Sequence, residues 1–147
     1  MIIGIDPGCG RNTGVCLLDD QGKVANLVTC SPDQAKELLR GGYSRGIRDV
    51  GIEYSASYHI YSRKNAGVRA TLKIAQNVAE NRCLAESLIG FAEGLGYRVY
   101  RVKPYKTKMN ANWFRDETGW KGRTSSHARD AYLVATRAEY MRLTTTQ

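Results

Sequence analysis

Three acidic residues and a histidine, widely separated in the chain, have the types and positions to form a cation-binding site. Asp6 ends an apolar run at the N-terminus, and Glu53 ends a second strand-like run at 48–53. His127 and Asp130 lie three residues apart near the start of an expected helix, so they share one face of that helix. Carboxylate oxygens with a neighbouring imidazole suit Mg²⁺ or Mn²⁺.

Such a cluster is suited to phosphodiester hydrolysis. Two divalent ions about 3.5–4 Å apart can activate a water molecule and stabilise the leaving oxygen. Without cations the carboxylates repel one another, so grouping them is costly unless they bind metal. Each residue also has an ordinary structural interpretation. Asp6 suits a turn before Pro-Gly, Glu53 a solvated strand end, Asp130 a charged helix face, and His127 a hydrogen bond at a helix start.

The expected order of elements would bring these residues together. Apolar periodicity and turn signals predict strands at 2–6, 13–18, 23–30, 48–53 and 97–102, and helices at 32–40, 66–94, 112–118 and 125–142. The first three strands form an antiparallel meander, and the helical crossover before the fourth predicts a parallel neighbour. We therefore expect one α/β domain over residues 1–147. Its mixed five-stranded sheet, three antiparallel strands then two parallel, is flanked by helices.

Capping residues set the boundaries of the first helix. Ser31 suits the N-cap position, Pro32 the first helical position, and Gln34 completes a capping box. The pair Gly41-Gly42 predicts the end of this helix at about residue 40.

The long helix at 66–94 has two apolar faces. One stripe contains Val68, Leu72, Ala75, Ala79 and Cys83, and a nearly opposite one contains Leu84, Leu88, Phe91 and Leu95. A helix with two apolar faces needs two partners. One is the sheet; the other is either more of the same chain or a second subunit, and both remain open. The last helix is expected to pack through Ala128, Ala131, Tyr132, Ala135 and Ala138.

The positive charge is concentrated in the last third of the chain. The net charge is +8, and residues 97–147 carry 11 basic and 4 acidic side chains. This distribution favours a surface that faces a polyanion such as nucleic acid. The segment YRVYRVKPYKTK, with Arg98, Arg101, Lys103, Lys106 and Lys108 among its three tyrosines, suits a phosphate-binding groove. Other basic residues suited to extend this groove are Arg63, Lys64, Arg69, Lys121, Arg123 and Arg129.

The remaining composition points to a reduced compartment. The four cysteines form no CxxC pair and have no metal-ligand spacing, so we expect free thiols and a cytoplasmic location. No apolar run is long enough for a transmembrane helix, and the N-terminus does not have the pattern of a signal peptide. No membrane partner and no small-molecule cofactor are expected.

Four segments resemble the RuvC-type Holliday junction resolvases of the ribonuclease H-like superfamily. The opening IIGIDPGCGRNTGV is similar to the family's first strand and its loop, and VGIEYS to the strand that carries its glutamate. The stretch from NAGVRATLK to KPYKTK resembles the long helix, the next strand and the basic segment. SSHARDAYLVA resembles the terminal helix signature. The resemblance runs from residue 1 to about 140, with bacteriophage members as the most similar kind.

This resemblance implies a homodimeric endodeoxyribonuclease that cuts Holliday junctions and other branched DNA with two Mg²⁺ or Mn²⁺ ions. It implies Asp6, Glu53, His127 and Asp130 as the catalytic and metal-binding residues. Some members have aspartate at the position of His127. Neutral imidazole there would bind one metal or position the attacking water.

The resemblance also implies residues that contact DNA. Lys103 matches a basic position that the family uses near the scissile phosphate. The loop after Glu53 is longer than in bacterial members, whose loop carries an aromatic that stacks on bases at the junction centre. Tyr54, Tyr58 and Tyr61 are the candidates here, with Tyr58 favoured. The longer loop leaves open whether junctions, flaps or forks are preferred.

Three alternatives remain at the level of sequence. A YqgF-like nuclease would have the same fold and chemistry with structured RNA as substrate. A non-catalytic protein that binds DNA junctions would keep the basic surface without using the acidic residues. Actin-like sugar kinases also open with Gly-Ile-Asp, but they need two ribonuclease H-like halves, and 147 residues supply one.

Overall fold

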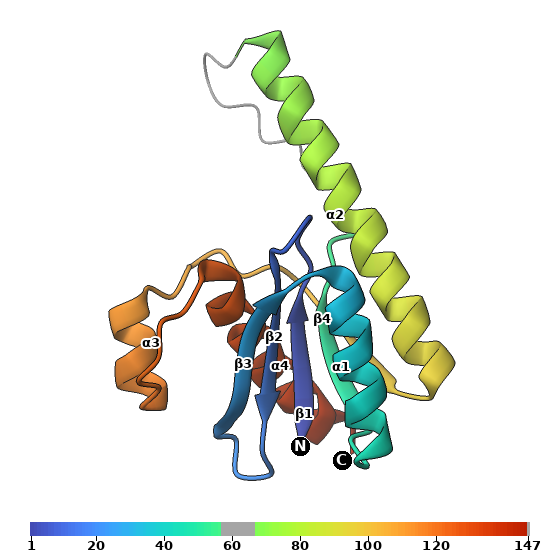
Figure 1. The fold of residues 1–147 in the computed structure, drawn as a ribbon, viewed down its shortest axis with the longest axis vertical. Helices are drawn as coiled ribbons and strands as arrows, with labels where there is room; N and C mark the ends of the chain where they lie inside the picture. Colours follow the sequence, from blue (N-terminus) through green and yellow to red (C-terminus); the bar gives the residue numbers. More distant parts are fainter. Residues whose placement is uncertain (57–66, 147) are drawn as a thin grey trace.

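The computed structural model of the chain describes residues 1–56 and 67–146. Every element predicted from the sequence is present in these ranges, with ends shifted by a few residues (Figure 1). The elements are β1 (Ile2–Asp6), β2 (Thr13–Leu18), β3 (Val24–Cys30), α1 (Pro32–Ser44), β4 (Asp49–Glu53), α2 (Val68–Leu95), β5 (Arg98–Val102), α3 (Ala111–Thr118) and α4 (Ser126–Thr145).

The five strands form one mixed sheet in the order β3-β2-β1-β4-β5. β1 is antiparallel to β2 and parallel to β4. Of the outer pairs, β2 and β3 are antiparallel, and β4 and β5 are parallel. The predicted arrangement of three antiparallel strands followed by two parallel ones is therefore confirmed. α1 and α2 pack on one face of the sheet and α4 on the other (Figure 1).

Strand alternation sorts the side chains between two cores. Ile3 and Ile5 of β1 belong to the core beneath α1 and α2, whereas Ile2 belongs to the core beneath α4. Successive side chains of a strand point to opposite faces, so the residues of β1 that follow Ile2 at intervals of two also face α4. Asp6 is one of them, and this parity directs its carboxylate toward the start of α4.

Glycines in the sheet allow α4 to lie unusually close to it. A Cβ atom at Gly4 would lie 2.4 Å from the carbonyl oxygen of Ala131, and one at Gly14 would lie 2.0 Å from that of His127. Gly51 of β4 makes the same kind of close contact with α4. Any side chain at these positions would push the helix away from the strands. The small residues thus fix the distance between the start of α4 and the ends of β1 and β2.

α1 continues beyond the end predicted from its glycines. The capping box at Ser31 is present, as predicted. However, Gly41 and Gly42 lie inside the helix, which ends at Ser44. A Cβ atom at Gly42 would lie 2.8 Å from the hydroxyl oxygen of Tyr97. Glycine at that position serves close packing rather than helix termination, which a local pattern cannot distinguish.

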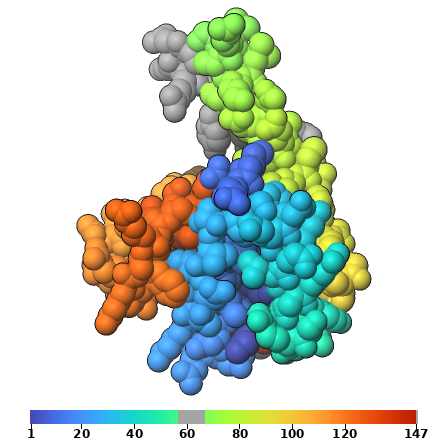
Figure 2. Space-filling view, in the orientation of Figure 1, coloured from blue at the N-terminus to red at the C-terminus, as the bar shows by residue number. Residues whose placement is uncertain are grey.

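α2 is packed along only part of its length. Its C-terminal half contacts the sheet and α1 through Leu84, Leu88, Phe91 and Leu95, and its N-terminal half stands out from the body of the molecule (Figures 1 and 2). Val68 and Leu72 on the opposite stripe are 78% and 64% exposed. Within the described residues this stripe has no apolar partner. None of the helices described is long and apolar enough to span a membrane.

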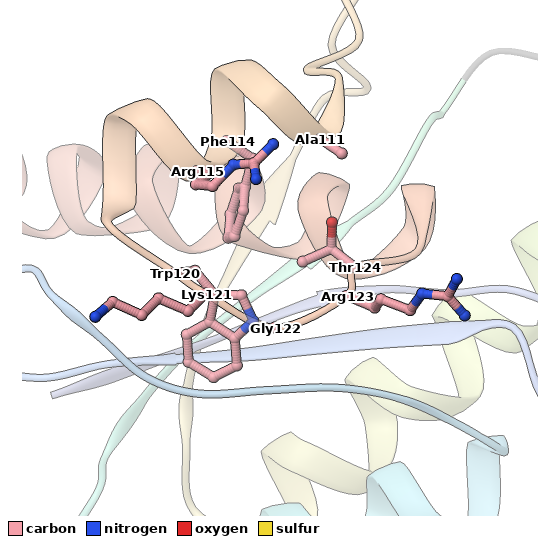
Figure 3. Close-up of a pocket in the computed structure, with 8 residues that line it drawn as sticks. All are labelled: Ala111, Phe114, Arg115, Trp120, Lys121, Gly122, Arg123 and Thr124. Atoms are coloured by element: carbon pink, nitrogen blue, oxygen red, sulfur yellow. The ribbon is translucent and has the colours of Figure 1, made fainter.

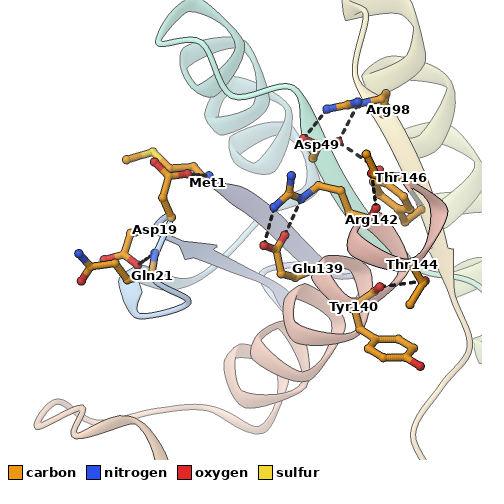
Figure 4. A network of polar contacts seen from close by, with 12 residues as sticks. Met1, Asp19, Gln21, Asp49, Arg98, Glu139, Tyr140, Arg142, Thr144 and Thr146 are labelled. Carbon is orange, nitrogen blue, oxygen red and sulfur yellow. Dashed lines mark hydrogen bonds and ion pairs between the residues drawn. The ribbon is translucent and has the colours of Figure 1, made fainter.

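An ion-pair network closes the end of the sheet opposite Asp6 (Figure 4). The buried carboxylate of Asp49, at the start of β4, accepts hydrogen bonds from Arg98 at 2.9 Å and from the Tyr100 hydroxyl at 3.3 Å. Arg142 of α4 pairs with Glu139 at 2.7 Å nearby. The first contacts lie within the sheet and the last lies within α4, and the charge of Asp49 also attracts the Arg142 guanidinium. The N-terminus of α4 faces the carboxyl ends of β1 and β4.

Candidate active site

The two predicted strand-end carboxylates lie on neighbouring strands. β1 and β4 are parallel and paired in register, with Ile5 opposite Ile52. Asp6 and Glu53 are the next residues along each strand, so both lie at the same edge of the sheet. The loop after Asp6 is held back against β2, because the buried Thr13 hydroxyl donates to the carbonyl oxygen of Gly8 at 2.9 Å.

The first turns of α4 bring the other two predicted residues to this edge. Ser125 caps the helix and accepts a hydrogen bond from the backbone of Ala128. His127 lies one turn before Asp130, and its Nδ1 is 2.9 Å from the Asp6 carboxylate. Asp130 is buried at 7% exposure. The helix N-terminus favours negative charge at this place.

A lysine completes the group. The Lys108 ammonium donates to the Asp130 carboxylate at 2.6 Å. Partial burial works against its positive charge, but the hydrogen bond and the attraction of Asp130, Glu53 and Asp6 prevail and raise the pKa of Lys108. The site therefore contains a fixed cation among three carboxyl groups.

Burial disfavours the ionised form of the carboxyl groups. It is the main cause that raises the pKa of Asp6 to about 6, with His127 opposing the rise and the charge of Asp130 adding to it. Burial is also the main cause that raises the pKa of Glu53 to about 7, with a further contribution from the charge of Asp6. Mutual repulsion of this kind means that these carboxylates share one electrostatic environment.

All four predicted residues line a single pocket. Its volume is about 350 Å³, and it is open at the carboxyl ends of β1 and β4. The lining residues are Asp6, Pro7, Glu53, Tyr54, Ser55, Val78, Asn81, Arg82, Ala85, Pro104, Lys108, His127 and Asp130. The sequence pattern gave no indication of Asn81 and Arg82. They lie between the two apolar stripes of α2, and only the path of that helix past the strand ends brings them to the pocket.

The donor set has the chemistry that a divalent cation requires, with Asp6, Glu53 and Asp130 as oxygen ligands and His127 as a nitrogen ligand. In the arrangement described, however, no three His, Cys, Asp or Glu side chains of residues 1–56 and 67–146 are grouped closely enough to hold a metal ion. Asp130 is instead paired with Lys108, and Asp6 with His127. Metal binding would thus replace Lys108 at Asp130, whereas Asp6 can bind a cation through its other carboxylate oxygen and keep its contact with His127.

Only part of the predicted basic groove lines the pocket. Lys108 lines it, whereas Lys103 and Lys106 are exposed and are not among its lining residues. Arg101 is exposed on β5 and lies 3.7 Å from Glu93 of α2. The segment after β5 contributes Pro104 and Lys108 to the pocket, and contact of Arg101, Lys103 and Lys106 with DNA stays a prediction.

Arg129 has a structural role rather than the phosphate contact expected for it. Its guanidinium donates to the carbonyl oxygen of Met109 at 2.7 Å and to that of Thr124 at 2.9 Å. A further bond reaches the Thr124 hydroxyl. Arg129 therefore fixes the segments on either side of α3 to the start of α4.

The loop residues predicted to contact DNA lie outside the described part of the chain. These are Tyr58, Tyr61, Arg63 and Lys64. Tyr54, one of the three candidates for base stacking, lies in the described part of the chain and lines the pocket. Its ring lies 5.9 Å from the Arg82 guanidinium, and its hydroxyl donates to Glu86 at 3.3 Å.

Two solved structures are similar to this chain over almost its whole length. T. thermophilus RuvC in complex with a Holliday junction substrate aligns with a TM-score of 0.60 and 21% identity, covering 97% of this chain and 94% of that one. The chain has a RuvC-type fold. A second Thermus thermophilus RuvC structure aligns with a TM-score of 0.53 and 20% identity, covering 98% and 96%. The ribonuclease H-like arrangement predicted from the sequence is thereby confirmed.

The comparison with solved structures supports the RuvC-type fold, whereas the comparisons with family models and curated proteins found no match. At about one residue in five identical, the likeness fixes the arrangement of strands and helices. One fold can host many functions, so the function of this protein depends on the residues of its pocket.

Proposed function

We propose that this protein is a divalent-metal-dependent endonuclease that cuts four-way junctions and other branched DNA. The observation that carries the proposal is the convergence of Asp6, Glu53, His127 and Asp130 in one pocket, at the strand ends of a RuvC-type fold. They come from three separate elements, and their spacing in the sequence gives no reason for them to meet other than a shared site. The similar protein bound to a Holliday junction supports DNA as the substrate.

The carboxylates would hold Mg²⁺ or Mn²⁺, and the bound cations would supply Lewis-acid activation of water and of the scissile phosphate. Three side chains of the pocket would act beside the bound cations. Asp6 orients the His127 imidazole through the 2.9 Å contact at Nδ1. Such an imidazole can take up a proton from water at its other nitrogen. The Lys108 ammonium, released from Asp130, would bind a phosphate oxygen.

A DNA substrate agrees with the rest of the surface. The net charge of +8 attracts a polyanion. The segment after β5 contributes Lys108 to the pocket and also carries the exposed Lys103 and Lys106, as a track for the phosphate backbone would require. The unpartnered apolar stripe on α2 suits a second copy of the chain, which would present two pockets to the two opposed strands of a junction.

The test is cleavage of synthetic four-way junctions, flaps and linear duplexes with Mg²⁺, with Mn²⁺ or with EDTA. Asp6→Asn should bind junctions as tightly as the unchanged protein and leave them uncut. Asp33→Asn, on the exposed first turn of α1, is the matched control and should cut normally. Equal cleavage by Asp6→Asn and the unchanged protein would refute the proposal. Preferential cleavage of structured RNA would indicate the YqgF-like alternative.

A further inference from the structure

A second cavity lies outside the candidate active site, between α3 and the loop 119–124 (Figure 3). Its volume is about 370 Å³. Two aromatic side chains, Phe114 and Trp120, line it together with three cationic ones, Arg115, Lys121 and Arg123. No carboxylate lines it, although α3 also carries Asp116 and Glu117.

Two glycines give the loop its shape. Gly119 ends α3 in the left-handed conformation, with φ of 71°. The chain then turns so that the Trp120 backbone donates to the Thr118 hydroxyl at 3.2 Å. The Trp120 indole lies against Gly122, where a Cβ atom would come within 3.0 Å of its nitrogen. The loop therefore folds closely around the indole and holds it at the cavity wall.

The cavity is fixed relative to the candidate active site. Thr124 closes the cavity on one side and is held by the Arg129 guanidinium through bonds of 2.9 Å to its carbonyl and hydroxyl oxygens. Arg129 directly precedes Asp130 in α4. His127 follows Thr124 by three residues. The cavity is thus attached to the first turns of α4, the helix that carries His127 and Asp130.

The cations of this cavity are available to a ligand. Lys121 and Arg123 are exposed, and within residues 1–56 and 67–146 neither forms an ion pair. Their side chains extend to opposite sides of the loop (Figure 3). A single strand that crosses the loop would bring its phosphates to both side chains. An indole between them offers the face on which a base stacks.

We propose that this cavity binds an unpaired nucleotide of single-stranded DNA, with Trp120 stacking on the base and Lys121 and Arg123 binding phosphates of the same strand on either side of the loop. The choice of DNA rests on the proposed function. The site would favour substrates with single-stranded arms, such as flaps and forks, over fully paired junctions. Aromatic stacking with phosphate contacts is the usual way in which proteins bind single strands without sequence preference.

Tryptophan fluorescence tests the site without any cleavage. The sequence has two tryptophans, so Trp113→Phe leaves Trp120 as the sole emitter. Short oligothymidylate should quench this emission. Lys121→Gln with Arg123→Gln should weaken the binding and lower its salt slope by about 1.4, because each phosphate contact with a single strand contributes about 0.7. Lys23→Gln with Arg45→Gln removes two cations at the opposite end of the sheet and should change neither quantity.

The outcomes separate this site from the proposed nuclease. Absence of quenching in Trp113→Phe, or equal quenching after loss of Lys121 and Arg123, would overturn the site even if junctions are cut. Tighter binding of oligouridylate than of oligothymidylate would overturn the assignment to DNA. Quenching in a protein that cuts no branched DNA would support the site and contradict the nuclease. Trp120→Phe, which leaves Trp113 as the emitter, should show no quenching.

Discussion

The carboxyl groups of Asp6 and Glu53 are the residues on which the proposed chemistry depends most directly. Each is held at a strand end where burial disfavours its charge, and their pKa values rise to about 6 and about 7. Lys108 lowers both values by its positive charge. It does not remove the cost of holding negative groups together, and a divalent cation is the partner that would do so.

The metal-free protein should therefore lose stability as the pH rises. Both carboxyl groups have folded-state pKa values above their ordinary values of 3.8 and 4.5, so folding favours their protonated forms. Their contribution to the free energy of unfolding is fully present below about pH 4 and is lost as the pH rises through about 6 and 7. Urea unfolding in EDTA at several pH values measures it.

Two comparisons make this pH dependence specific to the site. Asp6→Asn with Glu53→Gln should flatten the decline between pH 4 and 7, since neither amide ionises. Mn²⁺ should stabilise the unchanged protein above pH 7 but not this double variant. A decline of equal size in both proteins would place the titrating groups elsewhere.

At the scale of elements, the position of α4 decides whether the site exists. This helix carries His127 and Asp130, and it reaches the strand ends because glycines leave room for its backbone. Strand parity directs Asp6 to the same face. Nearer its far end, α4 lies close to β4 at Gly51, where a Cβ atom would lie 2.5 Å from that of Ala138.

Gly14→Ala should damage both stability and cleavage. Its Cβ atom would meet the His127 carbonyl oxygen at 2.0 Å, so the first turn of α4 must move away from β2. Overpacking of this kind costs about 1–3 kcal/mol. Gly90→Ala is the control: its Cβ atom would meet nothing within 4 Å in α2, and the change should stabilise the protein by up to about 1 kcal/mol. Urea unfolding and junction cleavage check both variants.

At the scale of the whole molecule, the protruding half of α2 is the feature that the isolated chain leaves unexplained. Val68 and Leu72 lie one helical turn apart and are 78% and 64% exposed, and neighbouring exposed apolar side chains of this kind are typical of an interaction surface. Together with the N-terminal half of the helix they form a ridge beyond the body of the molecule (Figure 2). We expect a second copy of the chain to cover this ridge, as proposed above.

Leu72→Glu should shift the protein from dimer to monomer, because a charge cannot be buried in an apolar interface without a partner. Analytical ultracentrifugation measures the change. Asn77→Glu adds the same charge on the opposite side of α2 and should leave the assembly unchanged. A monomer at all concentrations in the unchanged protein would contradict the dimer proposal.

DNA binding by the whole protein should depend steeply on salt. Lys103→Gln with Lys106→Gln should lower the slope of log affinity against log salt by about 1.8, because each phosphate contact with a duplex contributes about 0.9. The exposed positions of both residues make a folding defect improbable as the cause of any change. An unchanged slope, measured with catalytically inactive Asp6→Asn on a four-way junction, would remove them from the groove.

The sequence by itself determined the order of the elements, the sheet and the identity of the four pocket residues. Periodicity, capping at Ser31 and the strand-ending carboxylates Asp6 and Glu53 are local signals. Such signals depend only on neighbouring residues and can therefore be recognised in the sequence alone. Where a local signal had two meanings it failed, as at Gly42, which packs against Tyr97 instead of ending α1.

Only the tertiary structure decided which residues share a space. Lys108 rather than Lys103 enters the pocket, Arg129 supports the backbone around Thr124, and Arg82 joins from α2. The cavity at Trp120 likewise exists only because α3 and the following loop close on one another. These facts depend on distances between side chains far apart in the sequence. Such distances are set by how helices pack on the sheet, and no spacing along the chain encodes them.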